Sequence, residues 1–155
     1  MSPRRLTESL VRKAPHVKVD APIAEALRAI LDSNLPAVPV VDAEGRLAGV
    51  FGEREFIEAL FPGYLGQLKS ASFVRRALDD ALEKRATCGR EPVSEHMLTE
   101  HIDVPSDASD AQIAETFFHH RVPLLPVVED GLVVGVITRR DFFHRLAERV
   151  LDAGA

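Results

Sequence analysis

Hydrophobic and polar residues follow two spacings along this chain, and together they predict a mixed fold of helices and strands. Apolar side chains three and four residues apart are typical of a helix with one buried face. Such spacing occurs at Ile23, Leu27, Ile30 and Leu31, at Phe56 and Leu60, at Ile113, Phe117 and Phe118, and at Phe142, Leu146 and Val150. We therefore expect four amphipathic helices with these residues on their buried faces.

Short apolar runs bounded by Pro, Gly and Asp predict strands between these helices. Asp130-Gly131 lies between two β-branched runs and is a signal for a tight hairpin. The expected order of elements is β-α-β-β-α, and it occurs twice. The expected strands are residues 17–19, 37–41, 47–51, 102–104, 124–128 and 132–137.

This order recurs because the chain repeats itself. Residues 35–56 read LPAVPVVDAEGRLAGVFGEREF, and residues 122–142 read VPLLPVVEDGLVVGVITRRDF. A repeat of this length predicts two related units packed about a pseudo-twofold axis, with one cleft for each unit. In this register Pro39 corresponds to Pro126, Gly49 to Gly135, and Leu10 to Met97.

The repeat divides the chain into three parts and predicts an α+β fold. We expect the first repeat at residues 1–60, a helical insert or linker at 61–92, and the second repeat at 93–155. The insert is mildly basic, and we interpret it as a solvated helical face in preference to a docking surface for a partner. Its expected helices carry Leu68, Phe73, Val74, Leu78 and Leu82.

Composition restricts the class of protein. A chain of 155 residues with 46% hydrophobic content has enough apolar surface for a real core. Its apolar runs are too short to span a membrane, and no secretory signal is visible. The single Cys88 cannot form an internal disulfide, which favours a reducing cytoplasm. A net charge of −5 argues against nucleic-acid binding, so an anionic ligand needs local positive groups.

The segment from Gly135 to Phe142 reads GVITRRDF and contains the candidate site, because a strand there runs directly into a helix. The N-terminus of a helix favours an anion through its dipole and its unpaired N–H groups. Arg139 and Arg140 are unfavourable in the first turn unless a bound phosphate offsets them. Asp141 offers two acceptor oxygens that match the vicinal hydroxyls of a ribose. A flat base would need an apolar slot, expected from Ile102, Val104, Val122, Pro123 and Leu124.

A purely structural role also fits two of these residues. Thr138 followed three residues later by Asp141 is close to a capping box, which needs no ligand. Capping does not account for the two arginines or for the repeat, and both roles can coexist in one helix start. We therefore predict a ligand site that includes Thr138, Asp141, Arg139 and Arg140.

The first repeat carries a weaker version of the same segment. Gly52 replaces the threonine, Glu53 stands where the second repeat has Arg139, and Glu55 stands where it has Asp141. These changes disfavour phosphate. We predict a weaker second site from Glu55, Arg54 and Pro36.

The duplicated pattern of a Pro-Val-Val strand, an Asp-Gly turn and Gly-apolar-apolar-Thr-x-x-Asp resembles the paired cystathionine-β-synthase-type (CBS) domains, or Bateman module. The resemblance covers roughly residues 6–60 and 93–150. It implies two β-α-β-β-α units, clefts that bind adenosine-containing ligands, and a homodimer of modules. It also implies that Asp141 contacts ribose hydroxyls and that Thr138 contacts ribose or phosphate.

The remaining candidates for chemistry are weak. His119 and His120 are adjacent and point in different directions on a helix, and no HxxxH or CxxC spacing is present, so no metal site is expected. No nucleophile elbow or Walker loop appears, so we expect no enzyme activity and no cofactor. We predict a regulatory sensor of AMP, ADP or ATP that passes its signal to a separate effector protein. The alternative is a ligand-free interaction scaffold with vestigial clefts.

Overall fold

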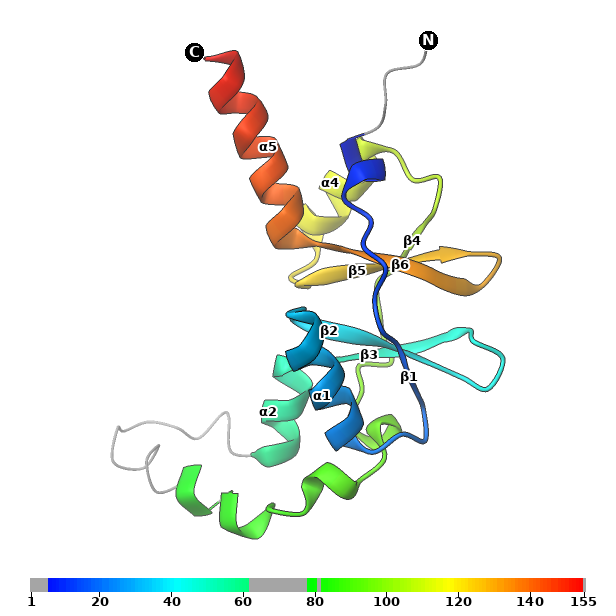
Figure 1. Ribbon diagram of the computed structural model, residues 1–155, viewed down its shortest axis with the longest axis vertical. Helices are drawn as coiled ribbons and strands as arrows, with labels where there is room; N and C mark the ends of the chain where they lie inside the picture. The colour runs from blue at the N-terminus through cyan, green and yellow to red at the C-terminus, as the bar shows by residue number, and fades with distance from the viewer. Residues whose placement is uncertain (1–5, 62–77, 81, 155) are drawn as a thin grey trace.

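The computed structural model describes residues 6–61, 78–80 and 82–154, and it contains two three-stranded sheets with helices beside them (Figure 1). The order β-α-β-β-α occurs twice, as the repeat predicts, and the α+β fold is confirmed. The first half contains η1 (Leu6–Ser9), β1 (Val17–Lys18), α1 (Ile23–Ser33), β2 (Ala37–Val41), β3 (Leu47–Gly52) and α2 (Glu53–Leu60). The second contains η2 (Cys88–Arg90), η3 (Val93–Glu95), β4 (Val104–Pro105), α4 (Asp110–His119), β5 (Leu124–Glu129), β6 (Leu132–Thr138) and α5 (Arg139–Ala153).

Both sheets have the same topology. The short first strand pairs in parallel with the second, and the second pairs with the third as an antiparallel hairpin. In the second hairpin Asp130 and Gly131 have φ angles of 53° and 82°, which is the left-handed turn that the Asp-Gly pair predicts. Each hairpin ends directly at the first residue of a helix, so the two sheets present two equivalent helix starts.

The two repeats pack sheet against sheet, one above the other in Figure 1. Leu35, Ala37 and Val50 from the first repeat form one buried cluster with Leu124 and Val136 from the second. Each repeat also has a core of its own between its sheet and its helices. The clefts therefore lie at the boundary of two units that share a common apolar layer.

The leading segment of each repeat crosses to the sheet of the other repeat. Arg12 forms two backbone hydrogen bonds with Val136 of the second repeat, at 2.8 and 2.9 Å. Leu98 forms two with Val50 of the first repeat, at 2.8 and 3.1 Å. Leu10 is accordingly part of the second core. The third strand of each repeat is thus hydrogen-bonded to a backbone segment that comes from the other repeat in the sequence.

Two glycines allow this exchange. A Cβ on Gly135 would lie 2.7 Å from Cγ1 of Val11, and a Cβ on Gly49 would lie 2.8 Å from Sδ of Met97. Val11 therefore occupies the place of Met97, whereas the sequence register assigned that place to Leu10. The register of the repeat is off by one residue in these leading segments.

Several expected details differ from the structure. The first strand of the second repeat lies at Val104–Pro105 instead of 102–104. Leu31 and Phe118 are exposed, and so are Leu146 and Val150 on α5. The buried stripe of α5 is limited to its first turn, where Phe142 is buried, because the helix extends past the sheet it begins from (Figure 1).

The described part of the insert lies against the first repeat. Arg85 donates from Nε to the carbonyl oxygen of Ala59 at 3.0 Å, which ties the segment to the end of α2. Leu78 and Leu82 are exposed. The predictions for Leu68, Phe73 and Val74 fall outside the described residues. Among the described residues, no helix has the length and apolar character needed to cross a membrane.

Candidate functional site

Thr138 ends β6 and caps α5. Its side chain is buried, and its Oγ1 accepts a hydrogen bond from the backbone N–H of Asp141 at 3.1 Å. The predicted cap is therefore confirmed. The carboxylate of Asp141 faces Arg12 instead of completing a capping box, with Nε to Oδ2 at 2.6 Å and Nη2 to Oδ1 at 2.9 Å.

The first backbone N–H groups of α5 are partly used by the protein itself. The N–H of Arg139 donates to the carbonyl oxygen of Pro123 at 2.9 Å, and that of Asp141 donates to Thr138. Of the first three, only the N–H of Arg140 has no partner among the described residues. Attraction of an anion to this helix start must therefore come largely from side chains and from the helix dipole.

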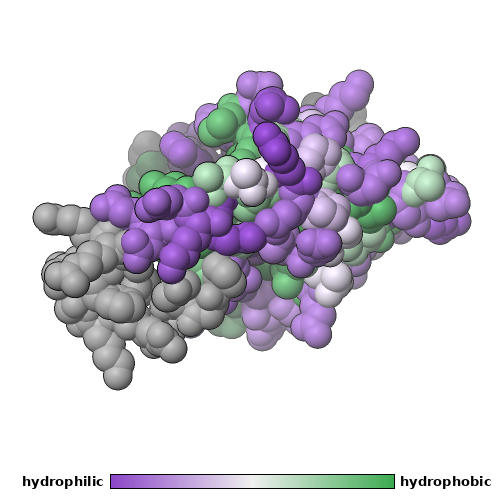
Figure 2. Space-filling model, turned by 90° about the horizontal axis from the view of Figure 1, so that it is seen from below, coloured by the Kyte–Doolittle hydropathy of each residue, from purple (hydrophilic) through white to green (hydrophobic). Residues whose placement is uncertain are grey.

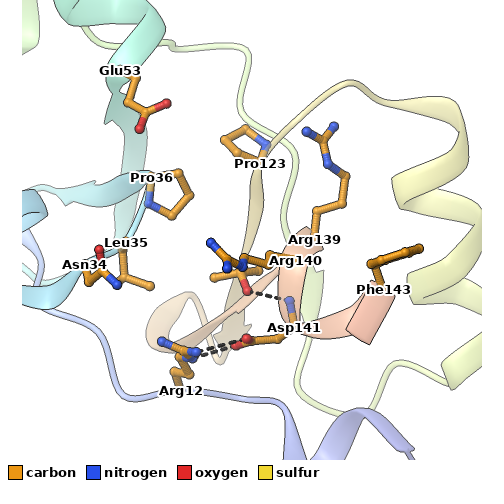
Figure 3. Close-up of a pocket in the computed structure, with 11 residues that line it drawn as sticks. Arg12, Asn34, Leu35, Pro36, Glu53, Pro123, Arg139, Arg140, Asp141 and Phe143 are labelled. Carbon is orange, nitrogen blue, oxygen red and sulfur yellow. Dashed lines mark hydrogen bonds and ion pairs between the residues drawn. The ribbon is translucent and has the colours of Figure 1, made fainter. Parts of the chain in front are cut away.

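A pocket of about 830 Å³ opens in front of this helix start (Figure 3). We call it the α5 pocket. It is lined by Arg12, Asn34, Leu35, Pro36, Glu53, Pro123, Thr138, Arg139, Arg140, Asp141 and Phe143. Three arginines and two carboxylates give it a net positive lining, and Leu35, Pro36 and Pro123 supply an apolar surface.

The two arginines in the first turn of α5 are exposed and available. Within the described residues, neither the guanidinium of Arg139 nor that of Arg140 has a hydrogen-bond or ion-pair partner. Figure 3 shows them pointing in different directions, with Arg140 extending toward the side of Leu35 and Pro36. Both are positioned to meet an anion without first breaking a contact.

A second pocket of about 520 Å³ lies in front of the other helix start, and we call it the α2 pocket. Its charged lining is Glu53, Arg54, Glu55, Glu58 and Arg121, and its apolar lining includes Met97, Leu98, Ile102, Val122 and Leu124. Three carboxylates face two arginines, so the carboxylates of this pocket outnumber its guanidinium groups by one.

Glu55 is the counterpart of Asp141 but has a different partner. Its Oε1 accepts a hydrogen bond from the N–H of Gly52 at 3.0 Å, and partial burial raises the pKa of its carboxyl. A Cβ on Gly52 would lie 2.6 Å from Cβ of Ala37 and 2.8 Å from the carbonyl oxygen of Pro36. The strands have closed around this glycine, so the threonine of the second repeat does not fit here.

The structure divides the predicted ligand-binding residues between the two pockets. Thr138, Arg139, Arg140 and Asp141 line the α5 pocket together, as expected. The expected apolar slot is elsewhere: Ile102, Val122 and Leu124 line the α2 pocket, beside the predicted Arg54 and Glu55. Pro36 and Pro123 line both pockets. Val104 lines neither, because it is buried in the second core and pairs with Val127.

The expected slot residues lie apart from Thr138 because each pocket combines the helix start of one repeat with the residues that lead into the second strand of the other repeat. Leu35 and Pro36 therefore stand beside Thr138, where Val122 and Pro123 were expected. Asn34, in the left-handed conformation that ends α1, was also missed, as was Arg12. The repeat relates Leu35 to Val122 and Pro36 to Pro123. This equivalence could have indicated that Leu35 and Pro36 also line a pocket.

One cluster among the described residues brings together donors that metals use. Ligand atoms of Glu91, Glu95 and His96 lie within 4.8 Å of one another. Oε1 of Glu91 is already 2.7 Å from Nη2 of Arg85 and 2.7 Å from Nε2 of His96. The hydrogen bond from Arg85 holds the pKa of Glu91 below its ordinary value. This guanidinium would repel a cation, and the cluster is best described as a structural tether.

Comparison with protein families gives one match. The family model described as CBS domain matches residues 8–62 and 93–148, which together cover most of the chain. Among curated proteins, inosine-5'-monophosphate dehydrogenase of Methanocaldococcus jannaschii is 23% identical over 143 residues. That match covers 92% of this chain and 23% of the dehydrogenase, so the chain spans about a quarter of that relative.

Solved structures of the same architecture are also similar. The CBS domain of a CBS-domain-containing membrane protein from Sphaerobacter thermophilus superposes with a TM-score of 0.69 and 26% identity, covering 90% of this chain and 86% of that one. CBSX2, solved in complex with AMP, gives 0.65 and 19%, covering 90% and 94%. The CBS domain pair of MJ0100, solved with 5'-methylthioadenosine and S-adenosyl-L-methionine, gives 0.68 and 20%, covering 95% and 99%.

Proposed function

Because the chain belongs to the CBS domain family, we propose that it is a regulatory protein that binds an adenosine-containing nucleotide in the α5 pocket. The observation that carries this proposal is the lining of that pocket. The guanidinium groups of Arg139 and Arg140, which have no partner within the part of the chain that the structure describes, stand at the N-terminus of a 15-residue helix, beside an apolar surface. Phosphate is attracted by the first feature and a purine base by the second.

The pocket has the chemistry that each part of such a ligand requires. Leu35, Pro36 and Pro123 offer apolar contact to a flat base. Asp141 offers acceptors for ribose hydroxyls, and Arg139 and Arg140 offer donors to phosphate. Two proteins of the same fold were solved with adenosine-containing molecules: CBSX2 with AMP, and the MJ0100 pair with 5'-methylthioadenosine and S-adenosyl-L-methionine. These neighbours support the ligand class, and the charge of the pocket favours the phosphorylated members.

A thermal-shift series with AMP, ADP, ATP and S-adenosylmethionine tests this function. A ligand at 100 times its Kd stabilises the folded state by about 2.7 kcal/mol, which corresponds to about 5 to 10 °C in Tm for a chain of this size. We expect at least one phosphorylated nucleotide to give such a rise, and Asp141→Ala to lose most of it relative to its own unliganded Tm. Absence of any shift with every ligand would favour the alternative, a ligand-free interaction scaffold.

The duplication supplies a matched pair of variants for locating the site. Arg140 in the α5 pocket and Arg54 in the α2 pocket are equivalent in the repeat, and both are exposed. We expect Arg140→Ala to weaken AMP binding about tenfold, the value of one charge-assisted hydrogen bond. Arg54→Ala removes the same charge from the other pocket and should leave the Kd for AMP unchanged. Equal effects of the two variants would contradict the assignment.

The exposed apolar residues of the second repeat support a homodimer. Phe118 on α4 is 85% exposed, and on α5 Phe143 is 65% and Val150 72% exposed. By contrast, the face of the molecule shown in Figure 2 is mainly hydrophilic, with hydrophobic groups in small separate patches. Groups of exposed apolar residues mark interaction surfaces.

We propose that a second copy covers α5 and that a separate effector protein responds to the bound nucleotide. Val150→Asp should then lower the mass measured by light scattering from dimer to monomer, and an unchanged mass would contradict this.

A further inference from the structure

We propose that Arg12, in the leading segment of the first repeat, makes the α5 pocket selective for phosphate-bearing ligands. It does so by neutralising the carboxylate of Asp141 while keeping other donors available to the ligand. This inference rests on the proposed nucleotide site and adds a residue that lies outside the strand-to-helix segment.

The ion pair between Arg12 and Asp141 uses both carboxylate oxygens. Nε of Arg12 is 2.6 Å from Oδ2, and Nη2 is 2.9 Å from Oδ1. A guanidinium has five N–H donors, so this arrangement leaves three of them unused. The side chain of Arg12 is 50% exposed and lines the pocket, whereas that of Asp141 is 22% exposed. Arg12 therefore fixes the carboxylate and retains donors at the pocket edge (Figure 3).

Arg12 also decides the sign of the charge in the pocket. Without it, Arg139 and Arg140 would only balance Asp141 and Glu53. With it, three cations face two carboxylates, and the lining is positive by one charge. A phosphate placed beside Asp141 would otherwise meet an unpaired negative group at short range.

The backbone holds Arg12 in this position. The N–H of Arg12 donates to the carbonyl oxygen of Val136 at 2.8 Å, and its own carbonyl oxygen accepts from the N–H of Val136 at 2.9 Å. Gly135 permits this close approach, because a Cβ there would lie 2.8 Å from the carbonyl oxygen of Arg12. The guanidinium thus extends from a segment that is anchored two residues before Thr138.

The other pocket shows what happens without this arginine. Leu98 makes the same pair of backbone hydrogen bonds with Val50 that Arg12 makes with Val136, so Leu98 is its structural counterpart. Leu98 lines the α2 pocket but offers no charge. Glu55, the counterpart of Asp141, has no guanidinium bonded to it among the described residues. The pocket with the arginine is net positive, and the pocket with the leucine is net negative.

Calorimetric titration of the full chain with AMP and with adenosine tests the inference. We expect Arg12→Ala to weaken AMP binding about tenfold, by loss of one charge-assisted interaction, and to change adenosine binding by less than about threefold. Arg12→Lys keeps the charge and should retain most of the preference for AMP over adenosine. Arg149→Ala is the control for removing an exposed arginine that lines neither pocket, and it should change neither Kd.

The outcomes separate this inference from the proposed function. If the parent protein binds AMP and Arg12→Ala weakens AMP and adenosine equally, Arg12 only positions Asp141 and the proposed selectivity is wrong. If Arg12→Ala binds AMP as tightly as the parent or more tightly, Arg12 does not assist phosphate at all. If the parent itself binds no phosphorylated nucleotide, both the function and the inference are wrong. Melting curves of Arg12→Ala and Arg12→Lys establish that each variant is folded before titration.

Discussion

The α5 pocket and the α2 pocket are built on one frame and differ in charge. Each has a helix start from one repeat, a Pro-containing strand entry from the other, and a leading segment that crosses to the opposite sheet. Arg139 in one pocket corresponds to Glu53 in the other, and Arg12 to Leu98. A duplicated frame can therefore keep its geometry while a few side chains reverse the sign of the charge in its pockets.

The comparison also separates what the frame needs from what the ligand needs. Gly135 and Gly49 occur in both repeats because the leading segments pass against them. Pro36 and Pro123 also occur in both repeats, and their carbonyl oxygens accept the first N–H of the helix of their own repeat, from Glu53 at 3.2 Å and from Arg139 at 2.9 Å. At the helix starts the repeats differ at three positions that line the pockets: Thr138 and Gly52, Arg139 and Glu53, Asp141 and Glu55.

The largest expected effect comes from breaking the frame. In Gly135→Ala the new Cβ would lie 2.7 Å from Val11 and 2.8 Å from the backbone oxygen of Arg12, so the leading segment must move. Overpacking of this kind costs about 1 to 3 kcal/mol, or about 3 to 10 °C in Tm. Differential scanning calorimetry measures the loss.

Gly89→Ala is the matched control for that substitution. Its new Cβ would lie 3.5 Å from Cβ of Ala24, which is an ordinary contact. We expect little change in Tm for this variant. A similar loss of stability in both variants would show that the close approach at Gly135 has no special cost.

The next effect comes from exchanging the charge that distinguishes the pockets. Arg139→Glu gives α5 the residue that α2 has at Glu53, and it leaves two cations facing three carboxylates in the α5 pocket. We expect the Kd for AMP to rise at least about tenfold. The helix itself should not weaken, because an acidic residue in the first turn is favourable to the dipole. Arg149→Glu makes the same charge change far along α5. Its Kd for AMP should equal that of the parent protein if the effect of Arg139→Glu comes from the pocket.

A smaller effect is expected at Glu53, which lines both pockets. Glu53→Gln removes one negative charge from the α5 pocket, and we expect AMP to bind about two- to threefold more tightly because partly exposed charges interact weakly. Glu58→Gln removes the same charge from the α2 pocket alone and should leave the Kd unchanged. Weaker binding of AMP by Glu53→Gln would mean that this carboxylate contacts the ligand instead of repelling it.

The smallest effect is a pH dependence from Glu55. Burial raises the pKa of this carboxyl above its ordinary value of 4.5, so the folded state holds the proton more tightly than the unfolded chain does. Stability is therefore lost as the pH rises through the raised pKa. Glu55→Gln removes this loss, and its amide oxygen can still accept from the N–H of Gly52. We expect its Tm advantage over the parent to be largest at neutral pH and to shrink toward about pH 4; an advantage that grows on acidification would contradict the sign.

The sequence predicted the repeated units and the grouping of four residues at the start of α5, for local reasons. The hairpin at Asp130-Gly131, the cap at Thr138 and the grouping of Arg139, Arg140 and Asp141 all depend on neighbours a few residues apart. Leu35 and Pro36, which give the α5 pocket its apolar lining, come from the other repeat, whereas the expected Ile102, Val122 and Leu124 line the α2 pocket. The spacing of residues along one repeat does not show which residues of the other repeat pack against it.

Arg12 was missed for a related reason. The register of the repeat set Leu10 against Met97 and therefore Arg12 against Thr99, whereas the backbone pairs Arg12 in the place of Leu98. A shift of one residue in an extended segment reverses which side chains face the pocket. Leu146 and Val150 on α5 are exposed although their spacing predicts a buried face. Periodicity shows that a helix has an apolar face, but it does not show whether the same chain covers that face.

A crystal structure of the protein grown with AMP would show which pocket holds the nucleotide. We expect one AMP in the α5 pocket, with its base against Leu35 and Pro36 and its phosphate near the first turn of α5, while the α2 pocket contains no AMP. Density for AMP in the α2 pocket with the α5 pocket empty would contradict it.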